Sequence, residues 1–423
     1  MTDIHFLLGE AQGTTLDDAL SRASRQPAWK PFDRRAIDFI ARFSQKLLTH
    51  PSIRAWPELA ALGHWFRRAR LQELAGSLSA PNDAVLRGRG LAFHLAPANV
   101  DSVSMYSWLL ALLAGNCNWV RVSQKASAQL DFVIDILREV LGEDVGAPVR
   151  GRIVLLTYAH DDQMTRRISE AAALRVVWGG DATVRAIRAI PLRPTAMEIC
   201  FPDRFSAAAL QAASLLAWDA SAWARLAANF YNDAFWFAQQ ACSSPRLLSW
   251  VGSESDCREA RARFWQAVEA EVARRQPENS PAMAMARLAT AFELAGQAAA
   301  HPGDGSELGH FPMRVAIERP LDAGMRDLHC GNGLFLEQRV DHLRQLAEQM
   351  TDKEQTLSVA GFSRAELLDF IDALPPRAVD RIVLTGEALT FSPVWDGTAL
   401  LQLFTRQIAL PPDRVAHATG GCP

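Results

Sequence analysis

One cysteine stands where a thiol would be able to act as a nucleophile. Cys242 lies in the segment 236–246, between an apolar, aromatic run and a Ser-Ser-Pro turn. Because proline is favoured in the first turn of a helix, residues 243–246 are expected to open one. The positive end of that helix dipole would favour the thiolate over the thiol. A buried cysteine is more often an inert packing residue, so the segment by itself leaves the role of Cys242 open.

The composition and charge exclude several classes of partner. The 423 residues are 49% hydrophobic and 22% charged, which is typical of a soluble globular protein with a sizeable core. The formal net charge of −3 gives no sign of a nucleic-acid-binding surface. The longest apolar run, residues 106–114, is too short to span a bilayer, and no signal peptide is evident. We therefore expect a cytoplasmic protein that does not bind nucleic acid and has no membrane-spanning segment.

The cysteines also bear on redox state and on metals. Six of them are scattered along the chain without a CxxC pair, which predicts reduced thiols and no structural zinc. His329-Cys330 is an isolated pair without metal-ligand spacing, so a packing or loop role is expected for it.

Strands and helices alternate in the first half of the chain. Short apolar strands are expected at 91–96, 118–123, 152–157, 174–178 and 195–201, with helical segments between them. This alternation predicts βαβ units and a parallel sheet, on which ligands bind at the carboxyl ends of the strands.

The remaining sequence suggests four regions in an α/β protein. They are an N-terminal helical region at 1–80, a nucleotide-binding domain at 81–215, a catalytic domain at 216–390 and a C-terminal tail at 391–423. Within the first region a single helix is expected over 56–74. Helical stretches are expected at 206–216 and 220–240, a looser segment at 276–308, and no clear element in the tail.

Two loops at expected strand ends have residues suited to a nucleotide. Gly179-Gly180-Asp181 closes one strand and opens a helix, where small residues let a phosphate approach the helix N-terminus. Arg121, Ser123 and Lys125 flank the end of another strand, where they could hold an adenosine ribose or its 2′-phosphate. For the glycine loop, the alternative is a tight βα turn with Asp181 as the N-cap of the helix. For the three residues at the other strand end, the alternative is an ordinary solvated surface.

Asn99 follows Pro97 directly after the first of these strands. A side-chain amide fixed there would donate to a developing oxyanion, a contribution worth about 3–4 kcal/mol in acyl transfer. An Asx turn or a cap on the following helix is the simpler local explanation.

Taken together, these segments resemble the LuxC-type acyl-CoA reductases, the fatty-acid reductase subunits of bacterial bioluminescence and their relatives. That family belongs to the aldehyde dehydrogenase superfamily. The resemblance covers roughly residues 85–400, and its most specific part is Gln-Gln-Ala-Cys-Ser-Ser-Pro, with the cysteine at 242. Further matches are the segments 95–101, 113–118 and 120–123.

The resemblance implies a fold and a set of roles. It implies an aldehyde-dehydrogenase-like fold, with a parallel-sheet nucleotide-binding domain followed by an α/β catalytic domain. Cys242 would be the acyl-accepting nucleophile, and Asn99 would donate to the oxyanion. An NADPH site would be lined by Pro97, Arg121, Ser123, Lys125, Gly179 and Gly180.

The chain departs from the wider superfamily at two carboxylates. The region of the general-base glutamate reads Met-Glu-Ile-Cys-Phe, in which Glu198 is the candidate base without being clearly in register. The region 329–335, matched to the run that holds the nicotinamide ribose, contains no carboxylate. A thioester reductase need not activate water, so a weak or displaced base would protect its acyl-enzyme.

The expected reaction is NADPH-dependent reduction of an acyl thioester, from acyl-CoA or an acyl carrier, to an aldehyde. The alternatives are an NAD(P)-dependent aldehyde dehydrogenase working in the oxidative direction and a redox-free cysteine acyltransferase. A scaffold that has lost activity is a further alternative. An acyl-transferring partner protein and a homo-oligomer are compatible with the resemblance.

Overall fold

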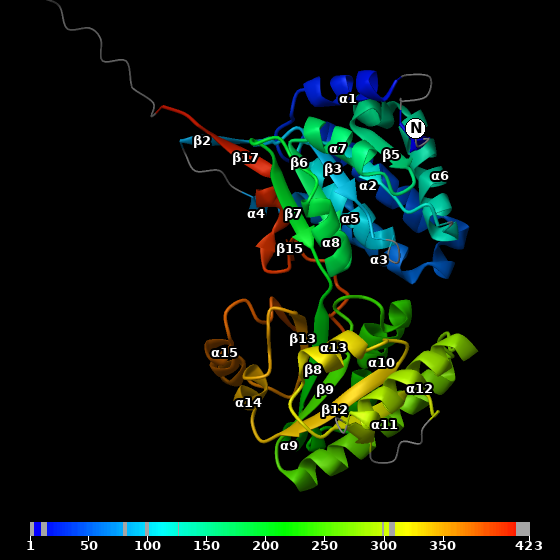
Figure 1. Cartoon of the computed structure of the whole chain (residues 1–423), viewed down its shortest axis with the longest axis vertical. Helices are drawn as coiled ribbons and strands as arrows, with labels where there is room; N and C mark the ends of the chain where they lie inside the picture. Colours follow the sequence, from blue (N-terminus) through cyan, green and yellow to red (C-terminus); the bar gives the residue numbers. More distant parts are fainter. Residues whose placement is uncertain are drawn as a thin grey trace, which may run out of the picture. The chain divides into compact units, whose positions relative to one another are not determined.

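The chain folds into two compact units (Figure 1). The computed structural model describes residues 4–9, 15–78, 83–97, 101–125, 127–297, 300–303 and 309–411. The first unit comprises residues 1–202 and 391–423, and the second comprises residues 203–390. The expected boundary at 215 is therefore displaced, because the strand that begins at Phe205 belongs to the second sheet.

The first unit is built on a six-stranded sheet. Its strands, in spatial order, are β1 (His5–Leu8), β5 (Ile153–Thr157), β4 (Cys117–Arg121), β3 (Leu91–Leu95), β6 (Leu174–Trp178) and β7 (Met197–Phe201). β1 is antiparallel to β5, and all other neighbours are parallel. The five strands expected from the alternating pattern are present, whereas β1 was not predicted.

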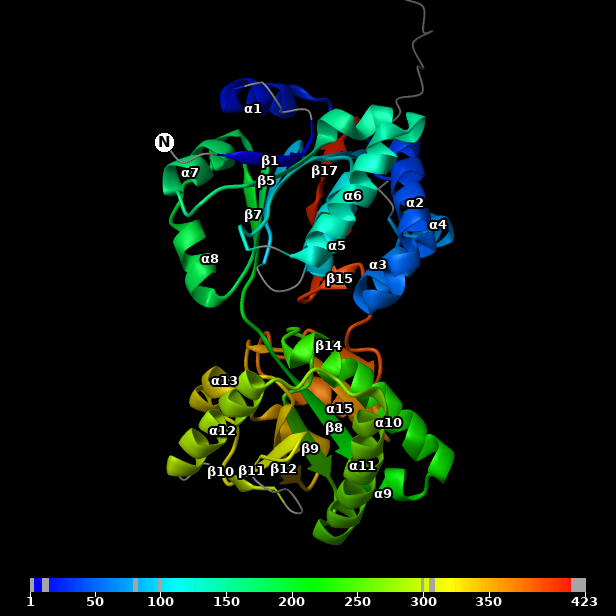
Figure 2. The same cartoon turned by 90° about the vertical axis from the view of Figure 1, so that its right-hand side faces the viewer.

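Helices cover both faces of this sheet (Figure 2). One face packs against α1 (Leu16–Arg25), α7 (Asp162–Ala171) and α8 (Asp181–Arg188), and the other against α2 (Arg34–Thr49), α5 (Asp101–Leu113) and α6 (Ala128–Gly142). Along β3, Leu91, Phe93 and Leu95 face the first group while Ala92 faces the second. This alternation is the pattern of a strand buried on both sides.

The N-terminal region and the tail are parts of the first unit. Phe39 and Leu62 are fully buried in the same core as Trp108 of α5. The helix expected at 56–74 is two helices, and the tail forms short elements that were not predicted. The two helices are α3 (Pro57–Trp65) and α4 (Arg68–Ser77), preceded by η1 (Pro51–Ala55), and a further short helix, η2 (Asp144–Arg152), precedes β5. The elements of the tail are β15 (Val394–Trp395), β16 (Thr398–Ala399), α16 (Leu400–Leu403) and β17 (Thr405–Ala409), which pairs antiparallel with β2 (Ala84–Gly88).

The second unit contains a seven-stranded sheet. In spatial order its strands are β10 (Ala300–Pro302), β11 (Met313–Ile317), β12 (Leu334–Val340), β9 (Leu247–Val251), β8 (Phe205–Gln211), β13 (Glu354–Ala360) and β14 (Arg381–Leu384). Only β10 is antiparallel to its neighbour among these described strands. The site-bearing strands β8, β9 and β13 lie in the interior of the sheet.

Two groups of helices enclose the second sheet. One face packs against α9 (Ala212–Leu216), α10 (Ala220–Phe235) and α11 (Glu254–Arg275), and the other against α12 (Pro281–Gly296), α13 (Ala323–Leu328), α14 (Leu343–Ala347) and α15 (Arg364–Ala373). Within the described parts of both units, no helix is long and apolar enough to cross a bilayer.

Three expectations for this unit are wrong. Residues 206–211 form β8 rather than a helix, because the sheet buries this alanine-rich segment between two helical layers. Residues 281–296 form α12, which begins with Ser280 as its cap and Pro281 in the first turn. Residues 243–246 do not open a helix; they form a turn that leads directly into β9.

Candidate active site

Cys242 lies in a turn that two strands hold in place. The turn joins η3 (Trp236–Gln239) to β9. Ser206, at the start of β8, donates its hydroxyl proton to the carbonyl oxygen of Cys242 at 2.7 Å. The same hydroxyl oxygen accepts the backbone N–H of Thr356, on β13, at 3.1 Å. One buried hydroxyl therefore ties the cysteine to both neighbouring strands.

The sulfur of Cys242 receives a hydrogen bond from a buried amide. Nε2 of Gln355 lies 3.3 Å from Sγ, and the Gln355 side chain is 4% exposed. The pairing of β13 with β8 shifts register between Glu354 and Leu357, which is the position of Gln355. An extra residue in one strand re-aims the side chains beside it, so we attribute the direction of Gln355 to this bulge.

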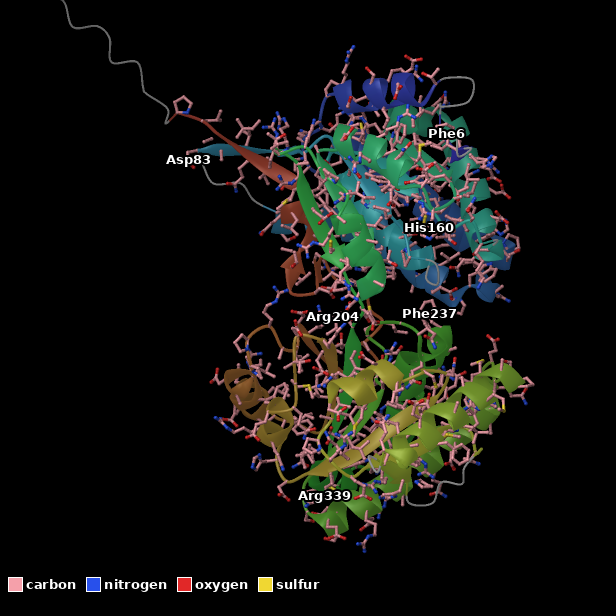
Figure 3. The ribbon with its side chains drawn as sticks, in the orientation of Figure 1. Phe6, Asp83, His160, Arg204, Phe237 and Arg339 are labelled. Carbon is pink, nitrogen blue, oxygen red and sulfur yellow. The ribbon has the colours of Figure 1, made fainter. Side chains whose placement is uncertain are left out.

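The chain before Cys242 has an unusual backbone conformation. Phe237, Ala238 and Gln239 have φ values of 55°, 51° and 63°, although none is a glycine. Left-handed conformations of this kind cost about 1 kcal/mol or more per residue, so surrounding contacts must stabilise them. Phe237 is labelled in Figure 3.

Those contacts come from Pro245 and from the segment 330–334, which contains a second left-handed stretch at 331–333. Gln239 donates from Nε2 to the carbonyl oxygens of Pro245 (2.8 Å) and Leu334 (2.9 Å). Its Oε1 accepts the N–H of Gly333 at 2.9 Å. Gln240 donates from Nε2 to the carbonyl oxygen of Cys330 at 2.9 Å. The two glutamines of the motif therefore fix the approach to the cysteine.

A buried guanidinium group adds positive charge near the sulfur. Arg246 is 9% exposed, and its Nε has no hydrogen-bond partner among the described residues. Burial lowers the pKa of this guanidinium, whereas charge on Asp203, Cys242 and Cys330 raises it. Because opposite charges favour each other, Arg246 in turn favours a negative sulfur on Cys242.

His329 has a structural role in the same region, as expected. Its Nδ1 accepts the N–H of Gly331 at 3.0 Å, so Nε2 carries the proton and donates to the carbonyl oxygen of Leu334 at 3.1 Å. Burial, together with the charge of Arg246, lowers the pKa of His329 to about 3. The imidazole is therefore neutral at physiological pH.

The residues expected to hold a nucleotide lie in the first unit. Arg121 ends β4, donates from Nη2 to the carbonyl oxygen of Tyr158 at 3.2 Å and stacks over the Tyr158 ring. The Nε atom of Arg121 is buried without a partner among the described residues. Ser123 accepts the N–H of the exposed Lys125 at 3.1 Å. Pro97 follows β3, and Asn99 lies outside the described residues.

Gly179 and Gly180 connect β6 to α8, as the sequence indicated. Gly180 is the N-cap residue of α8, and no side chain caps that helix end. A Cβ on Gly180 would meet no atom within 4 Å, whereas one on Gly179 would lie 3.1 Å from the side chain of Thr183. Packing by the described residues therefore explains a small residue at 179 and not at 180.

Glu198 lies on β7 and is bound by two arginines. Its carboxylate accepts a hydrogen bond from Nε of Arg175 at 2.6 Å and lies 3.4 Å from Nε of Arg188. Arg175 is 1% exposed and also donates to Ser169. The catalytic role of Glu198 stays a prediction, but these ion pairs give its carboxylate a structural role.

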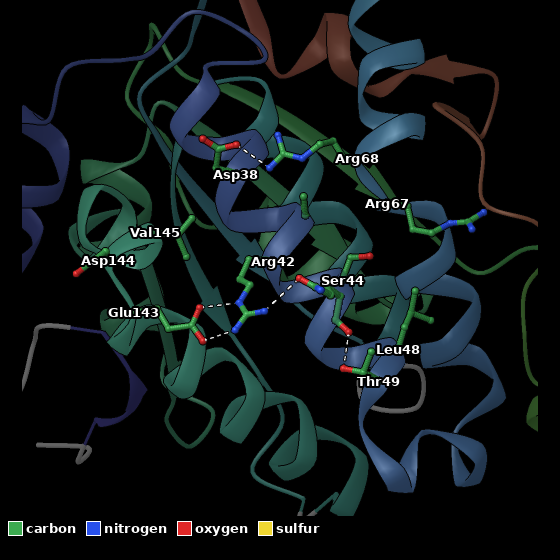
Figure 4. A pocket seen from close by; sticks show the side chains of 12 residues that line it. Asp38, Arg42, Ser44, Leu48, Thr49, Arg67, Arg68, Glu143, Asp144 and Val145 are labelled. Atoms are coloured by element: carbon green, nitrogen blue, oxygen red, sulfur yellow. Dashed lines mark hydrogen bonds and ion pairs between the residues drawn. The ribbon is translucent and has the colours of Figure 1, made fainter.

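A groove of about 1030 Å³ crosses the N-terminal helices of the first unit (Figure 4). Arg42 donates to both carboxylate oxygens of Glu143, at 2.7 and 2.9 Å, and Arg68 pairs with Asp38 at 2.7 Å. These two ion pairs neutralise four of the charged side chains that line the groove.

Sequence reasoning missed the roles of Ser206, Gln355 and Arg246. Arg246 stood within the recognised motif, four residues after the cysteine, so its charge was a usable signal. Ser206 and Gln355 lie 36 and 113 residues from Cys242 in the chain. Only the pairing of β8 with β13 brings these two residues to the turn.

Solved aldehyde dehydrogenases have similar structures. Betaine aldehyde dehydrogenase from Staphylococcus aureus, in complex with NAD+, has a TM-score of 0.66 and 13% identity, covering 98% of this chain and 95% of that one. NAD-dependent benzaldehyde dehydrogenase from Corynebacterium glutamicum has a TM-score of 0.63 and 15% identity, covering 96% and 94%. NAD-dependent aldehyde dehydrogenase from Sinorhizobium meliloti has a TM-score of 0.63 and 14% identity, covering 90% and 84%.

These similarities define the fold as aldehyde-dehydrogenase-like, which confirms the expected fold class. Residues 80–297, just over half of the chain, match the acyl-CoA reductase (LuxC) family. The chain belongs to that family and is an aldehyde-related oxidoreductase. A comparison with curated proteins found no significant match.

Proposed function

We propose that the protein reduces an acyl thioester to an aldehyde, using NADPH and an acyl-enzyme on Cys242. The observation that carries the proposal is the environment of the Cys242 sulfur, which accepts a hydrogen bond from Gln355 and lies near the positive charge of Arg246. Membership of the acyl-CoA reductase family supports the same reaction. The donor is acyl-CoA or an acyl carrier.

The chain's own residues perform the acylation. The sulfur of Cys242 attacks the carbonyl carbon of the thioester and forms a new C–S bond. The backbone N–H of Cys242 and the amide of Asn99 stabilise the developing oxyanion. The C–S bond to the donor then breaks, and the donor leaves as a thiolate.

The first unit has groups that fit a dinucleotide. The uncapped N-terminus of α8 presents backbone N–H groups that suit a phosphate, and Gly180 leaves space beside it. Arg121 has a buried Nε without a partner among the described residues. We assign NADPH to these residues together with Pro97, Ser123, Lys125 and Gly179. When bound, NADPH supplies the hydride that brings the acyl group to the aldehyde level.

Intact mass spectrometry tests the covalent step. Incubation of the protein with acyl-CoA in the absence of NADPH should add one acyl mass, and Cys242→Ala should abolish the adduct. Cys257→Ala, which removes a buried thiol of α11 in the same unit, is the matched control and should still be acylated. An adduct that survives Cys242→Ala, or no adduct at all, would contradict the proposal.

Nucleotide consumption separates the proposal from its alternatives. A reductase consumes NADPH in proportion to aldehyde formed across a panel of acyl-CoA chain lengths. A redox-free acyltransferase would form the adduct without consuming NADPH, and a scaffold would do neither. The cytoplasmic location, the acyl-transferring partner and the homo-oligomer stay predictions.

A further inference from the structure

The amide that contacts Cys242 has a defined orientation. Thr356 donates its hydroxyl proton to Oε1 of Gln355 at 3.3 Å, which directs the opposite end of the amide, Nε2, at the sulfur. An amide nitrogen has protons to donate, and its lone pair is delocalised into the carbonyl group, so Gln355 is a donor to the sulfur and not a base.

The strand that carries Gln355 is anchored beside it. Glu354 accepts hydrogen bonds from Nε of Arg326 and from the backbone N–H of Thr351, both at 2.6 Å. Ser206 accepts the N–H of Thr356 on the other side of Gln355. Because both neighbours are fixed, the amide is held at the sulfur without a further loss of side-chain freedom.

We propose that Gln355 is a catalytic residue that stabilises the thiolate of Cys242 by hydrogen bonding to Sγ. This inference rests on the proposed function and deepens it. In the acylation step the sulfur donates an electron pair to the carbonyl carbon, and the donor thiolate departs with the pair of the broken bond. When the aldehyde is released, the C–Sγ bond breaks and its electron pair returns to the sulfur. Gln355 stabilises the negative sulfur at both ends of this cycle.

The chemistry of the amide also suits a reductase. A carboxylate in this position would repel the thiolate and would be able to take a proton from water. An amide does neither, so the thioester on Cys242 is not exposed to a base at this point. The positive charge of Arg246 acts in the same direction as the amide proton.

The test is the rate of iodoacetamide alkylation of Cys242 in the full chain, followed from pH 5 to 10 by peptide mass spectrometry. Gln355→Leu keeps the approximate volume and removes the donor. We expect its alkylation rate at pH 7 to fall about tenfold, as for loss of a hydrogen bond to a charged group. Gln355→Glu should lower the rate further, because a carboxylate repels the thiolate.

Gln338→Leu is the matched control. Gln338 is also a buried strand glutamine of the second unit, but its amide donates to Ser249 at 3.0 Å. Its alkylation profile should match that of the wild type. An unchanged profile in Gln355→Leu, or an equal fall in Gln338→Leu, would overturn the inference. If Gln355→Leu fails to fold by circular dichroism, Gln355→Asn provides the same test, since its shorter amide cannot reach the sulfur.

Alkylation requires neither acyl substrate nor nucleotide. If the alkylation rate falls in Gln355→Leu as expected but acyl-CoA forms no adduct, the proposed function is refuted and the hydrogen bond from Gln355 to the sulfur is still supported. If acyl-CoA does form the adduct but the alkylation rate is the same in Gln355→Leu and in the wild type, only the inference about Gln355 is refuted.

Discussion

Glu198 carries a structural charge whether or not it also takes part in catalysis. Its carboxylate faces Arg175, a guanidinium that is 1% exposed and that bonds to Ser169 and to the carbonyl oxygen of Ile190 as well. A guanidinium at this depth requires a compensating anion, because an unpaired buried charge is strongly unfavourable. The local sequence identified the carboxylate but gave no sign of its partner, which lies on the neighbouring strand β6.

We expect Glu198→Gln to destabilise the first unit and to leave acylation of Cys242 intact. The loss should be about 2 kcal/mol in urea unfolding, below the usual cost of breaking a buried pair because glutamine still accepts a hydrogen bond. Glu170→Gln, at an exposed position of α7, should change little. If aldehyde oxidation instead fell about a hundredfold, Glu198 would be a general base and the oxidative alternative would gain support.

At the scale of elements, the approach to Cys242 depends on two left-handed segments that bond to each other. A Cβ at Gly331 would lie 2.5 Å from Nε2 of Gln240, and one at Gly333 would lie 2.5 Å from the ring of Phe311. Positive φ and close contact therefore both require glycine at these two positions. Segment 237–239 has no glycine and relies on hydrogen bonds to stay in this conformation.

Gln239→Leu should release that conformation. The substitution removes three hydrogen bonds to the main chain, worth about 1 kcal/mol each, and takes the side-chain partner away from the carbonyl oxygen of Pro245 and from the N–H of Gly333, whereas the carbonyl oxygen of Leu334 keeps its bond from His329. We expect a fall of about 3 kcal/mol in unfolding free energy and slower acylation of Cys242 by acyl-CoA. Gln240→Leu, which loses the contact to Cys330, should cost less. Equal stability of the wild type and Gln239→Leu would mean that packing alone holds the segment.

The sequence predicted elements well where local pattern and tertiary context agree. All five parallel strands of the first sheet were expected, because each is a short apolar run with turn signals at its ends. β8 was mistaken for a helix since alanine favours helices locally, while burial between two layers requires small residues in a strand. β1 was not predicted, because the strand with which it pairs, β5, is about 150 residues away in the chain.

The candidate site also has one part that the sequence predicted and another that it did not. The motif around Cys242 identified the nucleophile as a prediction, but the helix expected after it was wrong, so a helix dipole does not explain its environment. What surrounds the sulfur is assembled by strand pairing. No local pattern marks Gln355, since its function depends on a bulge in β13 opposite β8.

At the scale of the whole molecule, each unit has a core that buries a neutral histidine. In the first unit, Nε2 of His94 donates to Oδ1 of Asn118 at 3.1 Å, and Nδ1 accepts from Ser107 at 3.3 Å. Trp178 donates to the same Ser107 hydroxyl at 3.3 Å. This network satisfies the neutral imidazole only, and His329 has the same protonation state in the second unit. A fall in pH should therefore lower the stability of both cores.

The pH dependence can be worked out for His94. Burial lowers its pKa to about 4, against an ordinary value of 6.5. The unfolded chain consequently binds a proton that the folded chain does not, and stability falls as the pH drops below 6.5 until it approaches 4. At pH 5 the loss from this one group is about 2 kcal/mol relative to pH 7.5.

Urea unfolding at pH 7.5 and pH 5, followed by tryptophan fluorescence, measures this loss of stability. His94→Gln should reduce the difference in unfolding free energy between the two pH values by about 2 kcal/mol, because glutamine does not titrate. His64→Gln removes an exposed imidazole of α3 in the same unit and should leave the difference unchanged. If His94→Gln retained the full pH dependence, the imidazole of His94 would have to accept its proton within the folded core, and the network with Asn118 and Ser107 would have to rearrange around the cation.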